Sequence, residues 1–221
     1  MIARPRPTML TPRDVRVPPL GLEGILRLPA KPRGIVVFAH GSGSSRLSPR
    51  NNYVAEALGE SGLGTLLFDL LNEDEAADRR NVFDIELLAG RLIAAMKSLR
   101  EGPETRDFPL GLFGASTGAA AALVAAAGAM DVAAVVSRGG RPDLAHEALE
   151  AVRAPTLLIV GALDREVLAL NRAALARLGC EKRLEVVPGA THLFEEPGTL
   201  DVVVTLSRRW FEGHCGGATQ R

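Results

Sequence analysis

The segment Gly114–Gly118, GASTG, has the residue types and spacing of a turn that carries a nucleophilic serine. It follows the apolar run Leu110–Phe113 and precedes an alanine-rich stretch that favours a helix. In this setting a sharp strand-to-helix turn exposes the serine hydroxyl, and small flanking residues let the two backbones approach. Ser116 is therefore the candidate nucleophile. The competing interpretation is that the glycines only permit close packing and that Ser116 caps the helix.

A nucleophilic serine needs a base that takes its proton and a third group that orients the base. Among the four histidines we expect His192 to be this base, because it lies in the loop after the last apolar strand run. The other histidines are expected in a glycine-rich loop, inside a helix and in the C-terminal tail; they are His40, His146 and His214.

The orienting carboxylate should come from another loop at the same edge of a sheet. Asp164 closely follows the penultimate strand run, Thr156–Val160, and is the preferred candidate. Asp143, one strand earlier, is the second candidate, although its neighbours Arg141 and Pro142 favour a role as a helix N-cap.

Acyl transfer also needs backbone N–H groups that stabilise a developing oxyanion. Thr117, the residue after the nucleophile, supplies one of them. We expect the second from Ser42, with Gly43 as the alternative, in the loop HGSGSS that follows the strand run Ile35–Ala39. This loop does not fit a dinucleotide-binding turn, because Arg46 stands where that motif needs its third glycine. The sequence also has no phosphate loop of the G-x-x-x-x-G-K-S/T type.

Short apolar runs alternate with amphipathic segments along most of the chain. Eight runs predict strands at Val15–Val17, Gly24–Leu28, Ile35–Ala39, Thr65–Phe68, Leu110–Phe113, Val132–Val136, Thr156–Val160 and Leu184–Val187. Six segments predict helices at Asn51–Gly59, Val82–Arg100 (with Asn81 as N-cap), Thr117–Ala129, Leu144–Val152, Glu166–Leu178 and Leu200–Phe211. This alternation predicts an α/β fold with a mostly parallel eight-stranded sheet and helices on both faces. Ligands bind at the carboxyl ends of such strands, so the candidate residues should meet at one edge.

The composition limits the class of protein. The chain has 221 residues with 26 Lys+Arg and 26 Asp+Glu, so its formal net charge is zero. This balance argues against nucleic acid as a partner, since domains that bind it usually carry a basic excess. The hydrophobic share of 47% argues against disorder.

The N-terminal residues include prolines and arginines where a signal peptide would be apolar, and no apolar run is long enough to span a bilayer. Cys180 and Cys215 form neither a disulfide framework nor a metal-ligand cluster. We therefore expect a cytoplasmic protein with no membrane partner, no metal and no cofactor. Residues 1–11 are expected to form an N-terminal arm, residues 12–212 a single domain and residues 213–221 a flexible tail.

Four motifs in order, HGSGSS, GASTG, GALD and GATHLF, resemble those of the α/β-hydrolase superfamily over nearly the whole chain. The small size and the lack of an inserted cap domain are most similar to the dienelactone-hydrolase-like branch. The resemblance implies Ser116 as nucleophile, His192 as general base and then acid, and Asp164 as the residue that orients it. The best-known dienelactone hydrolases have a cysteine nucleophile, so generic carboxylic ester hydrolysis is a better expectation here than the dienelactone reaction.

We therefore expect a serine hydrolase that cleaves carboxylic esters or thioesters through an acyl-enzyme. The same triad also serves peptidases and acyltransferases, and a non-catalytic binding protein of this fold is a further alternative. The segment between Val132–Val136 and Thr156 is too short for a lid, so we expect small or short-chain acyl groups. The protein is expected as a monomer or a homodimer, since an exposed last strand can pair edge to edge.

Five arginines fall in loops at the carboxyl edge of the predicted sheet: Arg46, Arg50, Arg138, Arg141 and Arg165. A guanidinium can bind a carboxylate or a phosphate through two parallel hydrogen bonds. Arg138, and after it Arg46, are the candidates for selecting a substrate with an anionic group. The alternative is that these arginines pair with acidic side chains of neighbouring loops and contribute little.

Overall fold

The computed structural model describes residues 11–129 and 131–215 of the chain. The strands in these ranges are β1 Arg13–Val17, β2 Leu22–Arg27, β3 Ile35–Ala39, β4 Gly64–Phe68, β5 Leu110–Ala115, β6 Val132–Arg138, β7 Thr156–Gly161 and β8 Lys182–Val187. The helices are α1 Pro49–Glu60, α2 Glu73–Ala77, α3 Arg79–Val82, α4 Ile85–Glu101, α5 Thr117–Gly128, the 3-10 helix η1 Pro142–Ala145, α6 Ala148–Ala151, α7 Arg165–Arg177 and α8 Thr199–Cys215. Most of the predicted N-terminal arm and residues 216–221 of the predicted tail lie outside the described residues.

The strands form one sheet in the order β1-β2-β4-β3-β5-β6-β7-β8. β2 pairs antiparallel with β1 and with β4, whereas the pairs from β4 to β8 are all parallel. The predicted mostly parallel eight-stranded sheet is therefore confirmed. The chain passes from β3 to β4 on one side and then returns to β5 on the other, so a crevice opens at the carboxyl end of β3.

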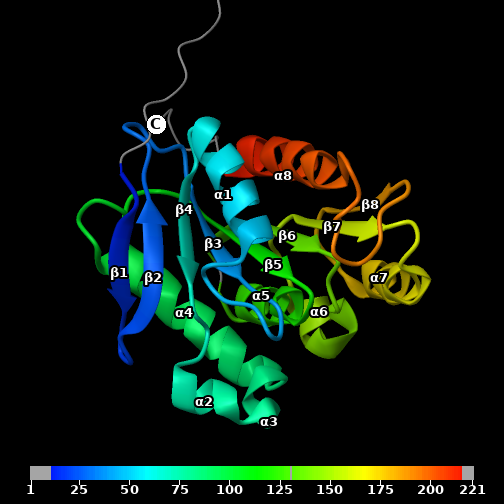
Figure 1. Ribbon diagram of the computed structural model, residues 1–221, viewed down its shortest axis with the longest axis horizontal. Helices are drawn as coiled ribbons and strands as arrows, with labels where there is room; N and C mark the ends of the chain where they lie inside the picture. The colour runs from blue at the N-terminus through cyan, green and yellow to red at the C-terminus, as the bar shows by residue number, and fades with distance from the viewer. Residues whose placement is uncertain (1–10, 130, 216–221) are drawn as a thin grey trace, which may run out of the picture.

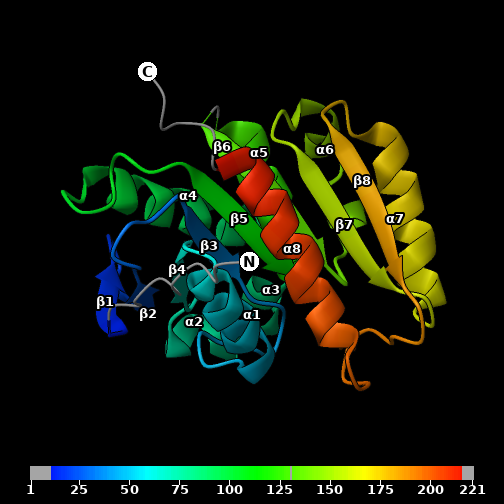
Figure 2. The same cartoon turned by 90° about the horizontal axis from the view of Figure 1, so that it is seen from above.

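Helices cover both faces of the sheet, as predicted. α1 and α8 lie on one face, and α4, α5 and α7 lie on the other (Figure 1). Seen from above, α8 runs diagonally across the middle of the sheet (Figure 2). The residues of β3 alternate between these layers: Val36 and Phe38 join the core under α1 and α8, and Ile35, Val37 and Ala39 join the core under α4 and α5. This explains why the whole strand is apolar.

The connection between β4 and α4 differs from the prediction. The segment between the predicted strand Thr65–Phe68 and the predicted helix Val82–Arg100, where the sequence predicted neither helix nor strand, contains the short helix α2 and most of the short helix α3. The N-cap of α4 is Asp84, whose side chain accepts a hydrogen bond from the Leu87 N–H group. Asn81, the predicted N-cap, instead donates its side-chain amide to the Glu75 carbonyl. The amide of Asn81 thus joins α2 to α3 and does not start α4.

Three further boundaries differ from the prediction. The predicted helix Leu144–Val152 is split into η1 and α6, because His146 between them has a positive φ of 43°. β6 extends beyond Val136 to Arg138, which places that arginine on the end of a strand. α8 continues through Gly213 to Cys215, residues that the sequence placed in the tail. None of the helices between residues 11 and 215 combines the length and apolar character needed to cross a bilayer.

Candidate active site

Ser116 occupies the sharp turn between β5 and α5. Its backbone has φ 51° and ψ −122°, which a residue with a side chain adopts only at a cost in conformational energy. The side chain makes no capping hydrogen bond to α5, so the structure gives no support to the N-cap interpretation. The hydroxyl is left available for other partners.

The two glycines of the turn are required by close backbone contacts. A Cβ atom on Gly114 would lie 2.4 Å from the Cα atom of Ala119, and one on Gly118 would lie 2.3 Å from the carbonyl oxygen of Ala39. The crowding that the G-x-S-x-G pattern predicted is therefore present at both positions. Larger residues there would force the helix away from the sheet and displace the serine between them.

His192 and Asp164 form a hydrogen-bonded pair at the carboxyl edge of the sheet. His192 Nδ1 lies 2.7 Å from Asp164 Oδ2. Asp164 holds the N-cap position of α7, yet its side chain makes no capping bond and is free to orient the imidazole. With the proton on Nδ1, Nε2 is the acceptor that a general base needs. No hydrogen bond joins Ser116 to His192 within the described ranges; such contacts often tighten only when substrate binds.

The alternative residues are engaged elsewhere. Asp143 accepts hydrogen bonds from Nε and Nη2 of Arg141 at 2.9 and 2.8 Å, and the N-cap position of η1 is held by Arg141. The predicted N-cap role of Asp143 is therefore wrong, because its carboxylate is bound by the preceding arginine. His214 lies in α8 with its Nδ1 2.7 Å from the Trp210 carbonyl oxygen.

The loop that carries His192 is held at several points. The N–H and hydroxyl groups of Thr191 donate to the Glu196 carboxylate at 3.1 and 2.6 Å. The hydroxyl bond in particular lowers the pKa of Glu196, so this carboxylate stays ionised. Phe194 has a positive φ of 57° and a fully buried ring that packs under the Arg138 guanidinium. These contacts hold the loop that carries the His192 imidazole.

The loop after β3 lies directly against Ser116. A Cβ atom on Gly41 would come within 2.9 Å of the Ser116 Cβ, so only glycine allows this approach. The Ser42 N–H group donates to Thr117 Oγ1 at 3.0 Å. The structure therefore brings Ser42 and Thr117, the two predicted oxyanion donors, into contact. It also shows that the Ser42 amide has the threonine hydroxyl as its partner in this state.

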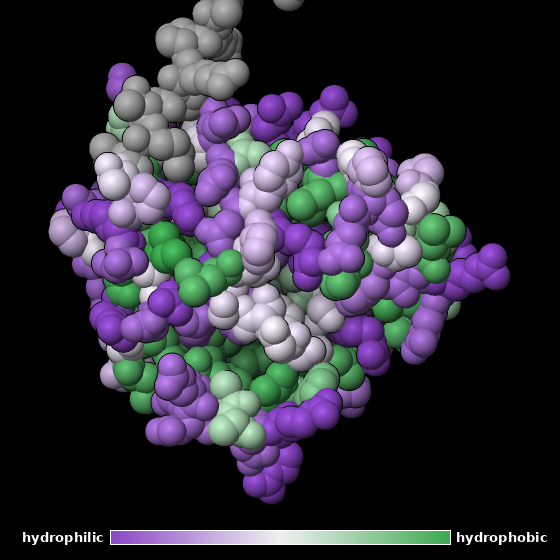
Figure 3. Space-filling view, in the orientation of Figure 1, coloured by the Kyte–Doolittle hydropathy of each residue, from purple (hydrophilic) through white to green (hydrophobic). Residues whose placement is uncertain are grey.

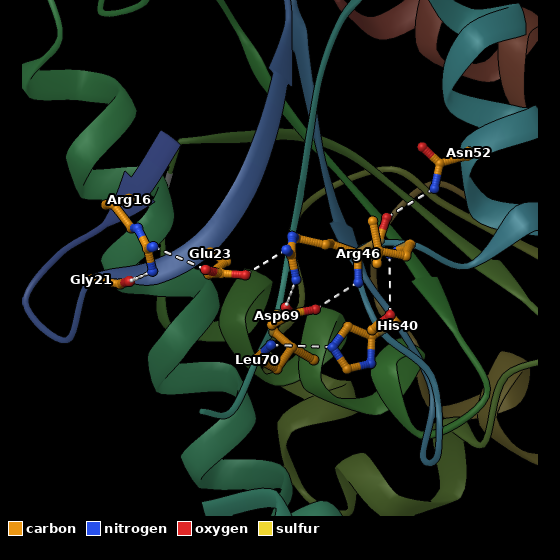
Figure 4. Close-up of polar contacts among 10 residues, drawn as sticks. Arg16, Gly21, Glu23, His40, Arg46, Asn52, Asp69 and Leu70 are labelled. Carbon is orange, nitrogen blue, oxygen red and sulfur yellow. Dashed lines mark hydrogen bonds and ion pairs between the residues drawn. The ribbon is translucent and has the colours of Figure 1, made fainter. Parts of the chain in front are cut away.

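His40 fastens the same loop to the end of β4. Its Nδ1 lies 3.0 Å from the Gly41 carbonyl oxygen. Its Nε2 accepts the Leu70 N–H group at 3.1 Å (Figure 4). Burial lowers the pKa of His40, and the two contacts suit a neutral ring with its proton on Nδ1. Sequence reasoning missed this structural role; the position of the histidine between a buried strand and a glycine-rich turn was the available signal.

Arg46 anchors the far end of the loop through carboxylates. Asp69 accepts the Arg46 N–H group at 2.7 Å and its guanidinium at 2.5 Å, and Glu23 on β2 binds the other side of the guanidinium (Figure 4). Arg16 on β1 extends this network to Glu23 at 2.9 Å. Arg46 is thus surrounded by acidic partners, an arrangement that does not favour substrate binding by this side chain.

Arg138 lies in the opposite situation. Its side chain is 7% exposed and has no carboxylate partner among the ion pairs of the described residues. Its contacts to the Asn51 side chain and the Leu193 carbonyl are long, at 3.4 and 3.5 Å, and its buried Nε has no partner. Desolvation, helped by the charge of Arg50, lowers the pKa of Arg138 to about 10, so it is still cationic at neutral pH.

One cavity of about 240 Å³ brings these groups together. Ser116, His192, Ser42, Arg138 and Arg50 all line it. Arg50 also pairs at 2.6 Å with Glu195, an acidic side chain of a neighbouring loop. The cavity therefore combines a strained serine, an oriented imidazole and a buried cation without a counter-ion. In such an arrangement an activated serine could attack a carbonyl carbon, and an unpaired guanidinium could bind an anionic group.

A family model for the dienelactone hydrolase family matches residues 22–205, which include every one of these groups. The chain belongs to the dienelactone hydrolase family. It is 52% identical to a dienelactone hydrolase from Anabaena variabilis, whose crystal structure superposes with a TM-score of 0.89 over 95% of this chain and 99% of that one. Est1E from Butyrivibrio proteoclasticus, at 15% identity and a TM-score of 0.77 over 93% and 99% of the two chains, shares the fold.

Another relative is a longer protein than this chain. A protein of Mycobacterium tuberculosis named "Putative phosphoribosyl transferase" is 61% identical over 200 residues. The match covers 90% of this chain and 45% of that protein. This dienelactone hydrolase family member thus spans about half the length of the curated relative it matches, and the relative's name describes the longer protein.

Proposed function

We propose that the protein is a serine hydrolase that cleaves carboxylic esters or thioesters through an acyl-enzyme on Ser116. The observation that carries the proposal is the 2.7 Å bond between His192 and Asp164, which orients the imidazole in the cavity that the strained Ser116 also lines. A peptidase or an acyltransferase would need the same three residues, and only the acceptor and the pocket would differ.

The proposed reaction begins when Ser116 Oγ attacks the ester carbonyl carbon while His192 Nε2 takes the hydroxyl proton. Asp164 stabilises the imidazolium that forms. The carbonyl oxygen becomes an oxyanion, which the N–H groups of Ser42 and Thr117 stabilise. The bond to the leaving group then breaks as His192 gives its proton to the departing oxygen or sulfur. Water repeats the sequence on the acyl-enzyme, releasing the carboxylic acid and restoring the serine.

We further propose that Arg138 binds an anionic group of the substrate. Support comes from its burial without a carboxylate partner and from its place on the cavity wall with Ser116 and His192. A desolvated guanidinium gains more from an incoming carboxylate than one that is already paired. Arg46 is not part of this proposal, since Asp69 and Glu23 occupy it.

The test uses a fluorophosphonate probe, which reacts with activated serines, and a panel of 4-nitrophenyl esters and acyl-CoA thioesters. Wild-type protein should be labelled and should turn over at least one class of substrate. Ser116→Ala should abolish both, and His192→Ala should lower turnover by several powers of ten, as triad residues act as a unit. Unlabelled wild-type protein, or a Ser116→Ala variant that keeps its activity, would exclude a serine hydrolase.

A further inference from the structure

A second cavity lies on the other side of the loop Gly41–Ser45. It has a volume of about 260 Å³ and shares Gly41, Ser42 and Ser44 with the cavity of Ser116. Thr117, the residue after the nucleophile, lines it as well. In the space-filling view hydrophobic surface surrounds a hollow below the centre of this face, in the region of the end of β4 and of α2 and α3 (Figure 3). A group bound there would reach the reacting serine across one loop.

The wall of this second cavity is mostly apolar. Its apolar side chains come from the end of β4 and from the three helices that follow it, and are those of Leu70, Leu71, Ala76, Val82 and Leu88. Two of the polar groups next to them are already engaged, since Asp69 binds Arg46 and His40 binds two backbone groups. The exposed Glu73 also lines the cavity and carries a negative charge. The cavity therefore suits a hydrocarbon group and offers no cation for a charged one.

The helices of this wall are held in place. Asn72 and Glu75 form a reciprocal capping box at the start of α2. The Glu75 carboxylate also pairs with Arg91 on α4 at 2.6 Å, with both side chains at most one quarter exposed. Glu75 thus holds α2 in place against α4, and the cavity that these helices line has a fixed shape.

The position of His192 decides which part of an ester enters each cavity. His192 must give its proton to the leaving group, and it lines the cavity of Arg138 but not the second cavity. The alcohol part therefore lies beside Arg138. The acyl part must extend the other way from the carbonyl carbon, past Ser42 and Thr117 and into the apolar cavity.

We propose that the second cavity is the acyl-binding pocket, and that the preferred substrate joins a compact hydrophobic acyl group, such as hexanoyl or benzoyl, to an alcohol that carries an anionic group. This inference rests on the proposed function. Ser116 forms its ester bond to the hydrophobic acyl group, and the anionic alcohol leaves with the proton from His192. An acetyl group leaves the apolar wall uncovered, and a palmitoyl chain exceeds its volume.

Two neighbouring alanines of α2 allow a matched test. Ala76 and Ala77 are both exposed, but only Ala76 lines the second cavity. The substrates are the acetyl, hexanoyl and palmitoyl esters of 4-hydroxybenzoate. Wild-type protein should prefer the hexanoyl ester. Ala76→Trp should lower kcat/KM for the hexanoyl ester by about tenfold or more, about 1.4 kcal/mol, and change that for the acetyl ester by less than about twofold. Ala77→Trp should leave the ratio of the two unchanged.

A second variant, Val82→Phe on α3, fills the same cavity from another side and should also lower the hexanoyl-to-acetyl ratio. Equal losses on both esters, or the same ratio in Ala76→Trp and Ala77→Trp, would overturn the acyl-pocket assignment while Ser116-dependent turnover persists. A wild-type preference for the acetyl or the palmitoyl ester would do so too. If the wild type cleaves no ester and Ser116 is not labelled by the fluorophosphonate, the proposed function itself fails.

Discussion

Two arginines at the same edge of the sheet differ in what surrounds them. Arg46 is held between Asp69 and Glu23, and it ties the loop after β3 to β2 and β4. Arg138 is more deeply buried, yet it has only long contacts to neutral groups and the ring of Phe194 beneath it. The first arrangement is complete without a ligand, whereas the second lacks an anion. The residue type alone therefore does not separate the two arginines, and the missing counter-ion is what supports the proposed binding role of Arg138.

The largest expected effect tests whether Asp164 and His192 act in catalysis in the cavity that Arg138 lines. Asp164→Asn should keep the position of His192 but favour the wrong tautomer, and kcat should fall about 10⁴-fold near neutral pH. The matched change Asp143→Asn affects a carboxylate bound to Arg141 and should leave kcat within about threefold. Steady-state kinetics on one activated ester compare the two variants. Similar activities would remove Asp164 from the triad.

The next effect separates the two arginines by substrate charge. Arg138→Met should raise KM for 4-hexanoyloxybenzoate by about tenfold, about 1.4 kcal/mol, and leave KM for the neutral 4-hexanoyloxybenzamide nearly unchanged. Arg46→Met should impair both esters to a similar extent, because it removes the guanidinium that ties the loop carrying Ser42 to Asp69 and Glu23. Equal losses on both esters in Arg138→Met would make Arg138 a structural residue.

The two arginines should also differ in their contribution to stability. Arg46→Met leaves Asp69 without its cation and Glu23 with Arg16 alone, and it should lower the free energy of unfolding by about 1–3 kcal/mol. Arg138→Met replaces a desolvated, unpaired charge by an apolar chain and should change it by less than about 1 kcal/mol or increase it. Arg80→Met, in an exposed pair with Asp78, is the control with almost no effect. Urea unfolding followed by circular dichroism gives the three values, and a larger loss in Arg138→Met than in Arg46→Met would contradict this comparison.

The smallest effect is a pH dependence of stability that arises from His40, which holds the same loop as Arg46. The pKa of His40 lies below its usual 6.5 in the folded protein, chiefly because of burial, so below that pH the unfolded chain binds a proton that the folded protein does not. Stability from this group is complete above about pH 6.5 and is lost as the pH falls towards the folded value. Between about pH 7.5 and about pH 5.5 the melting temperature of the wild type should drop more than that of His40→Gln. Equal drops would mean that His40 titrates alike in both states.

The sequence predicted where the candidate triad residues lie better than it predicted their surroundings. Ser116 and Asp164 follow strongly apolar strands, and His192 follows the more polar edge strand β8. Because these strands are parallel, the sheet brings the three loops to one edge. The wall formed by α2 could not be predicted, because Glu73-Asp74-Glu75 has the composition of a solvated loop and Arg91, which pairs with Glu75, is distant in the chain. The different surroundings of Arg46 and Arg138 depend on which carboxylates the fold brings near them. The residues next to each arginine in the sequence do not indicate these contacts.

The hydrogen bond from the Ser42 amide to the Thr117 hydroxyl affects which state of the reaction the amide stabilises most. In the proposed mechanism the Thr117 hydroxyl competes with the substrate oxygen for the hydrogen bond of the Ser42 amide. The weakly polar carbonyl oxygen of a bound ester gains little by displacing it. The charged oxygen of the tetrahedral intermediate gains far more, since hydrogen bonds to ionised acceptors are about twice as strong. The Ser42 amide then stabilises mainly the transition state. This raises kcat and does not tighten the binding of the substrate.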